Sequence, residues 1–200
     1  MSDAIRCHAF TPARWDDLAA LFGRNGACDG CWCMYWRHAS RSDWVAAKGA
    51  ANKRALKALL ADGTLHGALA YGHDAEGASL PVGWVDYGPR MDYPKLGRAR
   101  SLACQDAEHV WSVPCFFIKA GWRRRGVASA LLGFAVAQLR RQGAGIIEGY
   151  PRRAAQPGRR IAASDAWTGT IPMFEKAGFH PVGPEDGGKQ RMRLQVGARS

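Results

Sequence analysis

The feature that most constrains the fold is a long apolar run followed at once by a basic turn and an amphipathic pattern. Residues 110–119 read VWSVPCFFIK, a run typical of a strand buried on both faces. After Gly126 the apolar residues recur with helical spacing, namely Ala128, Leu131, Leu132, Ala135 and Leu139. Gly143 ends this pattern, and residues 144–150 form a second apolar run, AGIIEGY. We therefore predict a strand–helix–strand crossover at the centre of the fold.

The rest of the chain predicts further strands and helices of the same sheet. The remaining strands are expected at 4–10, 65–72, 80–88, 179–182 and 189–196. The remaining helices are expected at 15–22, 43–60 and 171–178. Residues 89–107 and 151–166 show neither period. This mixed order predicts an α/β (α+β mixed sheet) fold in a single domain over residues 1–200.

Composition indicates a globular protein with a core of its own. The chain has 200 residues, 47% of them hydrophobic, and a mean hydropathy of −0.27. No apolar run approaches the roughly 20 residues of a membrane-spanning helix, so we expect no membrane partner. The first residues, MSDAIRCHAF, lack the pattern of a secretory signal, and we expect a cytoplasmic protein. The six cysteines are then expected to be free thiols.

The charge balance points to a polyanionic partner. The formal net charge is +11, from 28 Lys and Arg against 17 Asp and Glu. The arginines gather at 123–125 and at 152, 153, 159 and 160. Nucleic acid, a membrane surface or a phosphate-rich cofactor would suit such charge, and a solvated basic surface would account for part of it.

The basic turn has the chemistry of a phosphate site. Gly126 and the small Ala128 let the backbone approach a ligand closely. A helix that starts there directs unpaired N–H groups and the positive end of its dipole at one point. The spacing Arg-x-x-Gly-x-Ala is neither that of a dinucleotide fold nor that of a P-loop.

With these residues in view, the sequence resembles the GCN5-related N-acetyltransferase (GNAT) superfamily. Arg123, Gly126 and Ala128 match its cofactor motif, with Trp122 before it and Ile118 at the strand end. A second family signature matches MFEKAGF at 173–179. The resemblance implies a central, mostly antiparallel sheet with one parallel, splayed strand pair, flanked by helices. It also implies acetyl-CoA as co-substrate.

The resemblance further implies which residues hold coenzyme A. Backbone groups of Phe116 and Ile118 would hold the pantetheine arm in the manner of an added strand. The main chain of the turn would cradle the pyrophosphate, through Arg123, Arg124, Arg125, Gly126, Val127 and Ala128.

Two catalytic positions depart from the family pattern. Ser112 stands where many relatives carry a glutamate base, and Phe174 stands where many carry a tyrosine acid. A base must come from elsewhere or be water, because the acceptor ammonium has to lose a proton before it attacks. Glu148, in the apolar run after the helix, and His109, at the entry of the central strand, are the best candidates, with Glu108 as a neighbour of the latter.

An aromatic-rich set of residues predicts the acceptor site. The residues assigned to it are Trp32, Tyr35, Trp36, Asp86 and Trp111. Aromatic rings could hold a cation or a flat ring, and the Asp86 carboxylate could hold the acceptor amine. Core packing is the alternative role for the same rings.

The cysteines near these aromatics invite a zinc interpretation. Cys28, Cys31 and Cys33 have His38 nearby but no clear second ligand pair downstream. Small thiols that pack beneath a pocket wall are the alternative, and we expect no bound metal.

Two function classes follow from these observations. The first is acetyl-CoA-dependent N-acetyl transfer to the amine of a small molecule, by direct attack in a ternary complex. A route through Cys115 is an alternative, although a buried thiol without a histidine partner is normally inert. The second class is a catalytically degenerate fold that senses coenzyme A or binds nucleic acid or protein. We do not expect nucleic acid as partner, and a homodimer is compatible with the chain.

Overall fold

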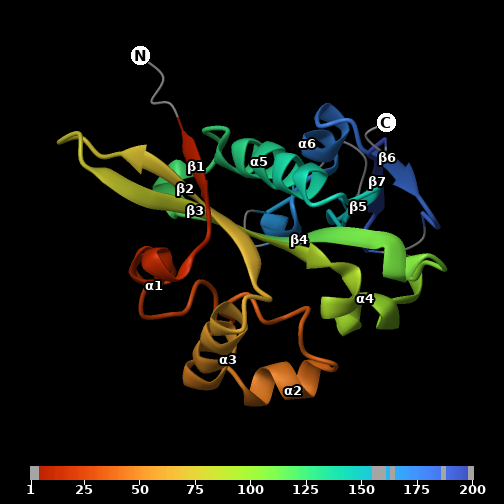
Figure 1. Cartoon of the computed structure of the whole chain (residues 1–200), viewed down its shortest axis with the longest axis horizontal. Helices are drawn as coiled ribbons and strands as arrows, with labels where there is room; N and C mark the ends of the chain where they lie inside the picture. The colour runs from red at the N-terminus through yellow and green to blue at the C-terminus, as the bar shows by residue number, and fades with distance from the viewer. Residues whose placement is uncertain (1–4, 155–160, 163–164, 186–187, 198–200) are drawn as a thin grey trace.

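The computed structural model describes residues 5–154, 161–162, 165–185 and 188–197. They form one seven-stranded sheet in the order β1-β2-β3-β4-β5-β7-β6. Strands β4 (Val110–Ile118) and β5 (Ile146–Gly149) pair in parallel, whereas all other neighbours are antiparallel. The predicted mixed sheet with one parallel pair is confirmed (Figure 1).

The predicted elements lie close to their observed bounds, but residues 89–107, where no helix is expected, contain a short α-helix at Pro94–Arg98. The remaining strands are β1 Arg6–Ala9, β2 His66–His73, β3 Ser79–Pro89, β6 His180–Val182 and β7 Arg191–Gln195. The α-helices are α1 Trp15–Phe22, α2 Arg41–Ala46, α3 Ala50–Ala61, α4 Pro94–Arg98, α5 Val127–Arg141 and α6 Ile171–Lys176. Short 3-10 helices are η1 Pro12–Arg14, η2 Arg90–Asp92, η3 Arg100–Leu102, η4 Ala107–His109, η5 Ala120–Trp122 and η6 Ala166–Thr168. None of these helices combines the length and the apolar character that a membrane crossing needs.

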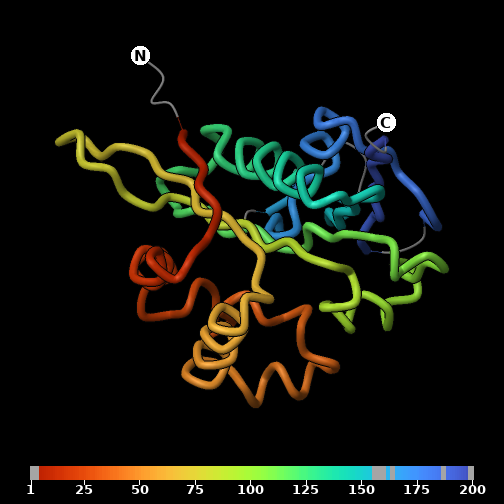
Figure 2. Tube along the Cα trace, in the orientation of Figure 1, coloured from red at the N-terminus to blue at the C-terminus, as the bar shows by residue number. Residues whose placement is uncertain are grey.

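The two faces of the sheet are covered by different parts of the chain. Helices α5 and α6 lie on one face, and α1 to α4 lie on the other, as the traces in Figures 1 and 2 show. The apolar stripe of α5 is buried against the first face through Leu131, Leu132, Ala135 and Leu139, as its spacing predicts. The second face holds a separate cluster that includes Leu18, Phe22 and Leu56 from the early helices.

One expected helix is in fact two. The sequence predicts a single helix over 43–60, but α2 ends at Ala46 and α3 begins at Ala50. Gly49 has φ +81°, a left-handed conformation that glycine adopts without strain and that interrupts the helix. The start of α2 is fixed by a reciprocal capping box between Ser40 and Asp43.

We predict that a single methyl group at the end of β5 will destabilise the fold. A Cβ added to Gly149 would collide with the ring of the fully buried Phe174. Gly149→Ala should lower the free energy of unfolding by about 1–3 kcal/mol, the usual cost of overpacking a filled core. Urea denaturation measures it.

Gly145→Ala is the matched control at the other end of the strand, where an added Cβ meets no atom within 4 Å among the described residues. Its unfolding free energy should change by less than about 0.5 kcal/mol. Equal stabilities of the two variants would show that Phe174 does not fill this space.

Candidate functional site

The parallel strand pair at the centre of the sheet separates partway along its length. β5 pairs with β4 only from Val110 to Val113, and β4 continues to Ile118 without a neighbouring strand on that side among the described residues. A β-bulge lies at the same place, because β3 pairs Asp86 with Cys115 and then Gly88 with Ser112. The extra residue on β4 bends the strand where its neighbour departs. We use the word cleft for this place, where β4 beyond Val113 has no strand partner on the β5 side among the described residues.

The cleft side of β4 is an unpaired strand edge. The N–H of Lys119 donates to the carbonyl of Val82 on β3 at 3.0 Å. Because hydrogen-bonding direction alternates along an antiparallel ladder, Phe116 and Ile118 direct their backbone groups away from β3, into the cleft. The carbonyl of Ile118 accepts a bond from Arg123 Nε there at 3.3 Å. An extended chain of amides could pair with this edge as an additional strand would.

We call Pro114, where β4 loses its pairing with β5, the vertex of the cleft. An aromatic side chain caps the strand edge there. The carbonyl of Pro114, the first β4 residue beyond the paired segment, accepts a hydrogen bond from Trp36 Nε1 at 3.1 Å. This bond fixes the segment after α1 against the point where the strands separate.

The turn after β4 has the geometry of an anion site. Arg124 and Gly126 have φ +64° and +80°, and α5 begins directly afterwards at Val127. No side-chain hydrogen bond caps α5 among the described residues, so the first N–H groups of the helix remain free for a ligand. The arginines at 123–125 line a concave surface of about 550 Å³ with Ala120 and Gly121.

Aromatic rings gather beside the vertex, around the Trp36 side chain that reaches Pro114. Tyr35, Trp36, Trp44 and Trp167, which we call the aromatic cluster, contact one another at centroid distances of 4.9–5.7 Å. The ammonium groups of Lys95 and Lys189 lie against its rings, at 3.6 Å from the Tyr35 centroid and 4.7 Å from the Trp167 centroid. The rings of the cluster therefore already make cation–π contacts with two lysine side chains of the same protein.

The structure brings only some of the predicted acceptor residues to this place. Tyr35 and Trp36 belong to the aromatic cluster. Trp32 packs instead beside α1, against Trp15 and Phe22. Trp111 lies near the start of β4 with its ring against the face that α5 covers, 5.7 Å from the ring of His66. Neither ring belongs to the aromatic cluster, because the sequence shows aromatic content but not which neighbours each ring packs against.

Asp86 is buried with half of its carboxylate unpaired. Its Oδ1 accepts hydrogen bonds from Arg37 at 2.9 Å and from the Tyr93 hydroxyl at 3.1 Å. Its Oδ2 is buried and has no partner among the described residues. Burial raises the pKa of Asp86, while Arg37 opposes that rise. Asp86 lies directly opposite Cys115 on β4, one residue from the vertex.

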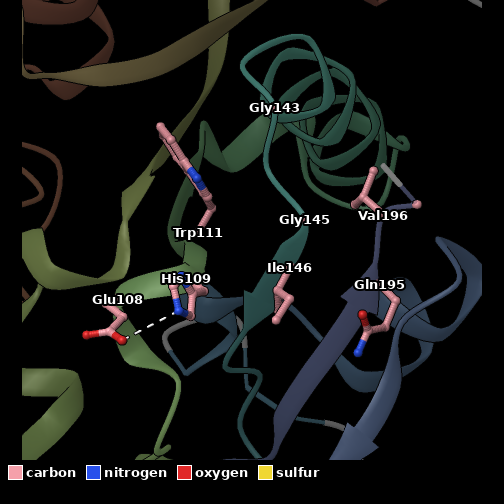
Figure 3. Close-up of a pocket in the computed structure, with 9 residues that line it drawn as sticks. Glu108, His109, Trp111, Gly143, Gly145, Ile146, Gln195 and Val196 are labelled. Atoms are coloured by element: carbon pink, nitrogen blue, oxygen red, sulfur yellow. Dashed lines mark ion pairs between the residues drawn. The ribbon is translucent and has the colours of Figure 1, made fainter. Parts of the chain in front are cut away.

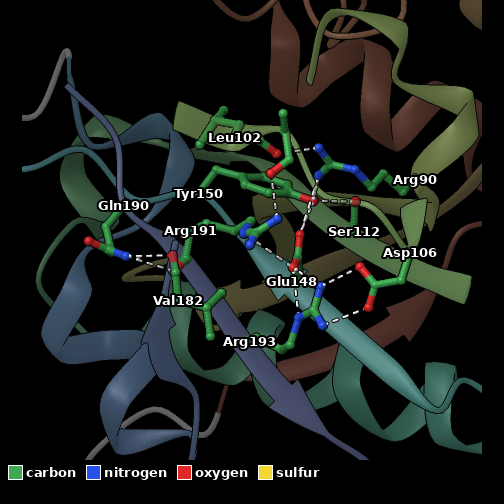
Figure 4. A network of polar contacts seen from close by, with 11 residues as sticks. Arg90, Leu102, Asp106, Ser112, Glu148, Tyr150, Val182, Gln190, Arg191 and Arg193 are labelled. Atoms are coloured by element: carbon green, nitrogen blue, oxygen red, sulfur yellow. Dashed lines mark hydrogen bonds and ion pairs between the residues drawn. The ribbon is translucent and has the colours of Figure 1, made fainter. Parts of the chain in front are cut away.

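Glu148 is the centre of a buried ion network (Figure 4). Its side chain is fully buried, and its oxygens lie 2.7 Å from Arg193, 3.3 Å from Arg90 and 3.6 Å from Arg191. The same Arg193 binds Asp106 through two hydrogen bonds, which lower the pKa of Asp106 to about 2. A carboxylate surrounded in this way by cations joins β5 to β7 and to residues 90–106. This placement supports a structural role rather than that of a base.

His109 ends η4, directly before the start of β4 and at the opposite end of that strand from the turn. Its side chain is 72% exposed and contacts Glu108 at 3.4 Å. It lines a cavity of about 590 Å³ with Trp111 and the strand ends around Ile146 and Gln195 (Figure 3). Pro114 lies five positions after His109, roughly 17 Å of extended strand. The structure does not bring this histidine to the cleft.

The two positions that depart from the expected acid and base are occupied by packed side chains. The Ser112 hydroxyl hydrogen-bonds the Tyr150 hydroxyl at 2.6 Å, and burial raises the pKa of Tyr150. Phe174 packs edge-to-face against Phe116 and Phe179 at centroid distances of 6.3 and 5.1 Å. Neither Ser112 nor Phe174 presents an acidic proton to the cleft.

The clustered cysteines are spread over different environments. Cys28 is exposed, whereas Cys33 is buried with its Sγ 3.6 Å from Cys115 Sγ. His38 Nε2 lies 2.8 Å from the Asn52 side-chain oxygen rather than beside a thiol. Within the part of the chain that the structure describes, no group of three His, Cys, Asp or Glu side chains is placed to hold a metal ion.

Three cationic residues near the cleft lie outside the predicted site. Arg37 pairs with Asp86, and Lys95 and Lys189 flank the aromatic cluster. Arg37 directly follows the aromatic segment of the sequence, and this position is a local signal that it belongs to the acceptor site. No local sequence pattern marks Lys95 or Lys189, because both reach the aromatic cluster only through contacts between residues that are far apart in the sequence.

A sheet whose one parallel pair separates partway, followed by a basic turn that opens a helix, is the architecture of the GNAT acetyltransferases. The model of the acetyltransferase (GNAT) family matches residues 33–179. The chain belongs to this family. None of the curated proteins matches the chain in sequence.

Solved structures share the fold at low identity. An N-acetyltransferase of this family from Kribbella flavida is 17% identical, with a TM-score of 0.55, and the match covers 96% of this chain and 98% of that one. The paia N-acetyltransferase from Thermoplasma acidophilum, solved with coenzyme A, is 13% identical with a TM-score of 0.53, covering 96% and 99%. A ribosomal-protein-alanine N-acetyltransferase from Brucella melitensis is 16% identical with a TM-score of 0.54, also covering 96% and 99%.

We predict that Glu148→Gln will be severely destabilising. Removing the carboxylate charge leaves Arg90, Arg191 and Arg193 without their common buried partner. Breaking one side of a buried ion pair costs about 3–5 kcal/mol, which urea denaturation would show.

The exposed Glu175→Gln is the control and should leave the free energy of unfolding nearly unchanged. A Glu148→Gln protein with normal stability but no acetyl transfer would contradict the structural role and restore Glu148 as the base.

Proposed function

We propose that the protein transfers the acetyl group of acetyl-CoA to the amine of a small molecule, with both substrates bound at once. The observation that carries the proposal is the unpaired edge of β4, which leads directly into the uncapped start of α5. One continuous surface thus offers backbone partners to an amide-containing arm and N–H groups to phosphates.

Phe116 and Ile118 are proposed to pair with the pantetheine amides through the backbone groups that face the cleft. The turn from Arg123 to Ala128 is proposed to bind the pyrophosphate. Its arginine side chains are exposed and line the concave surface beside the helix start, where they can add charge to the backbone contacts.

The acceptor amine is proposed to approach from the aromatic cluster. Trp36 and Tyr35 offer ring faces to an ammonium group, and the unpaired Oδ2 of Asp86 can accept its hydrogen bond. Water is the base that the placement of Glu148 and His109 favours, since the first is enclosed by arginines and the second is remote. The thiol of coenzyme A has a pKa near that of cysteine, roughly 8.5, so its thiolate can leave without a protein acid.

Coenzyme A binding without turnover is the second candidate function. Ser112 and Phe174 favour it, because both stand packed where a base and an acid would act in many relatives. Release of free thiol from acetyl-CoA, measured over a panel of small amines and N-terminal peptides, distinguishes the two candidates. Turnover with at least one small amine is the expected result, and binding without turnover of any amine would favour the second candidate.

We predict that Gly126→Val abolishes coenzyme A binding. Gly126 has φ +80°, which a β-branched residue adopts only with strain, and its side chain would project at the proposed pyrophosphate position. Calorimetry with acetyl-CoA should show at least a roughly hundredfold loss of affinity, equivalent to about 2.7 kcal/mol.

Gly63→Val is the matched control. Gly63 follows α3, far along the chain from the turn, has φ +70°, and has the same open surroundings as Gly126. Its backbone strain should therefore be similar, while its acetyl-CoA affinity should equal that of the parent. Unchanged affinity of folded Gly126→Val would place the cofactor elsewhere.

A further inference from the structure

Lys189 occupies the β5 side of the cleft, although no part of the proposed reaction uses it. An isolated bridge pairs it with Arg152, and the N–H of Gln190 donates to the carbonyl of Pro151 at 2.9 Å. These contacts extend the β5–β7 ladder beyond Gly149. Lys189 therefore lies level with the part of β4 that has lost its neighbour.

The side chain of Lys189 reaches toward the cleft vertex. Its Nζ lies 4.7 Å from the centroid of Trp167 and 5.7 Å from that of Trp36. The Trp36 indole in turn donates to the carbonyl of Pro114 at 3.1 Å. One indole ring thus separates the amine from the vertex. The Thr168 hydroxyl accepts a hydrogen bond from the amine at 3.3 Å.

The surroundings favour the neutral form of this amine. Burial and, to a smaller extent, the nearby charge of Arg152 lower the pKa of Lys189 to about 8. Cys115 and Asp165 act in the opposite direction with smaller effect. No described carboxylate lies within ion-pair distance of Nζ. The protonated form dominates below pH 8, and the nucleophilic neutral form grows as the pH rises through that value.

The position of the vertex suggests what such an amine would meet. An arm that pairs with Ile118 and Phe116 runs back along β4 toward Pro114, so the thioester at its end would lie near the vertex. A neutral amine held beside a thioester reacts far faster than one in solution, because binding replaces a collision.

We propose that Lys189 is a self-acetylation site, modified by bound acetyl-CoA when no acceptor amine is present. The Nζ lone pair attacks the acetyl carbon, an amide C–N bond forms and the thioester C–S bond breaks. Coenzyme A leaves as the thiolate and takes up the proton that Nζ loses, so no further reactant is needed. This inference rests on the proposed function.

Acetylation would change the acceptor side of the cleft. It removes a positive charge from the aromatic cluster and adds an acetyl group beside Trp36 and Trp167. The modified side chain would occupy space that an acceptor amine needs, so the modified protein should bind acceptors more weakly.

The test is to incubate the purified protein with acetyl-CoA alone and to follow acetylation of each lysine by peptide mass spectrometry. Lys189 should be acetylated roughly tenfold or more faster than the exposed Lys176 on α6, which reports reaction in free solution. The rate at Lys189 should rise with pH and reach half its maximum near pH 8. Lys189→Arg should abolish this modification while calorimetry shows unchanged acetyl-CoA affinity.

Three outcomes separate failure of this inference from failure of the proposed function. Acetyl-CoA binding with Lys189 modified no faster than Lys176 overturns the inference and leaves the proposed function intact. Equal acetylation of Lys189 in Gly126→Val, which should not bind acetyl-CoA, also overturns it, because the reaction would then be solution chemistry. Absence of acetyl-CoA binding to the parent protein overturns both.

Discussion

The separation of β5 from β4 after Val113 is the constraint on which the rest of the molecule depends. A sheet edge in the middle of a protein is costly, because its backbone groups lose water without gaining partners. Here the bulge on β4 turns the strand at this point, and Trp36 satisfies the first free carbonyl. The remaining edge is left for a ligand that carries its own amides.

The two faces of the sheet hold this opening in different ways. On one face, α5 packs its apolar stripe across the strands, and its start places free N–H groups at the end of the open edge. On the other face, an apolar cluster covers part of the sheet, and buried charges lie under β5. Glu148 draws three arginines together beneath β5, so the strand that departs from β4 is anchored by ion pairs to β7 and η2. Rigid walls on both sides keep the cleft from closing by strand pairing.

The sequence predicts the parts of this design that rest on local pattern. The apolar run of β4, the glycine at the turn and the stripe of α5 are all local, and the resemblance to the GNAT superfamily adds the strand pairing. The break at Gly49 was missed because helical periodicity continues through it. The face of the sheet on which a side chain lies does not follow from local sequence. For this reason the sequence predicts Trp111, but not Lys189, at the acceptor site. Alternate residues of a strand can be assigned to a face of the sheet only when the bulges and the neighbouring strands are known.

A crystal structure of the complex with acetyl-CoA would show which backbone groups of β4 and α5 the cofactor uses. We expect the pantetheine amides to pair with Phe116 and Ile118 on the β5 side of β4, and the pyrophosphate to lie on the N–H groups that open α5. The acetyl carbon should lie beside Pro114. A cofactor bound outside the cleft, or a cleft closed by pairing of β4 with β5 beyond Val113, would contradict this expectation.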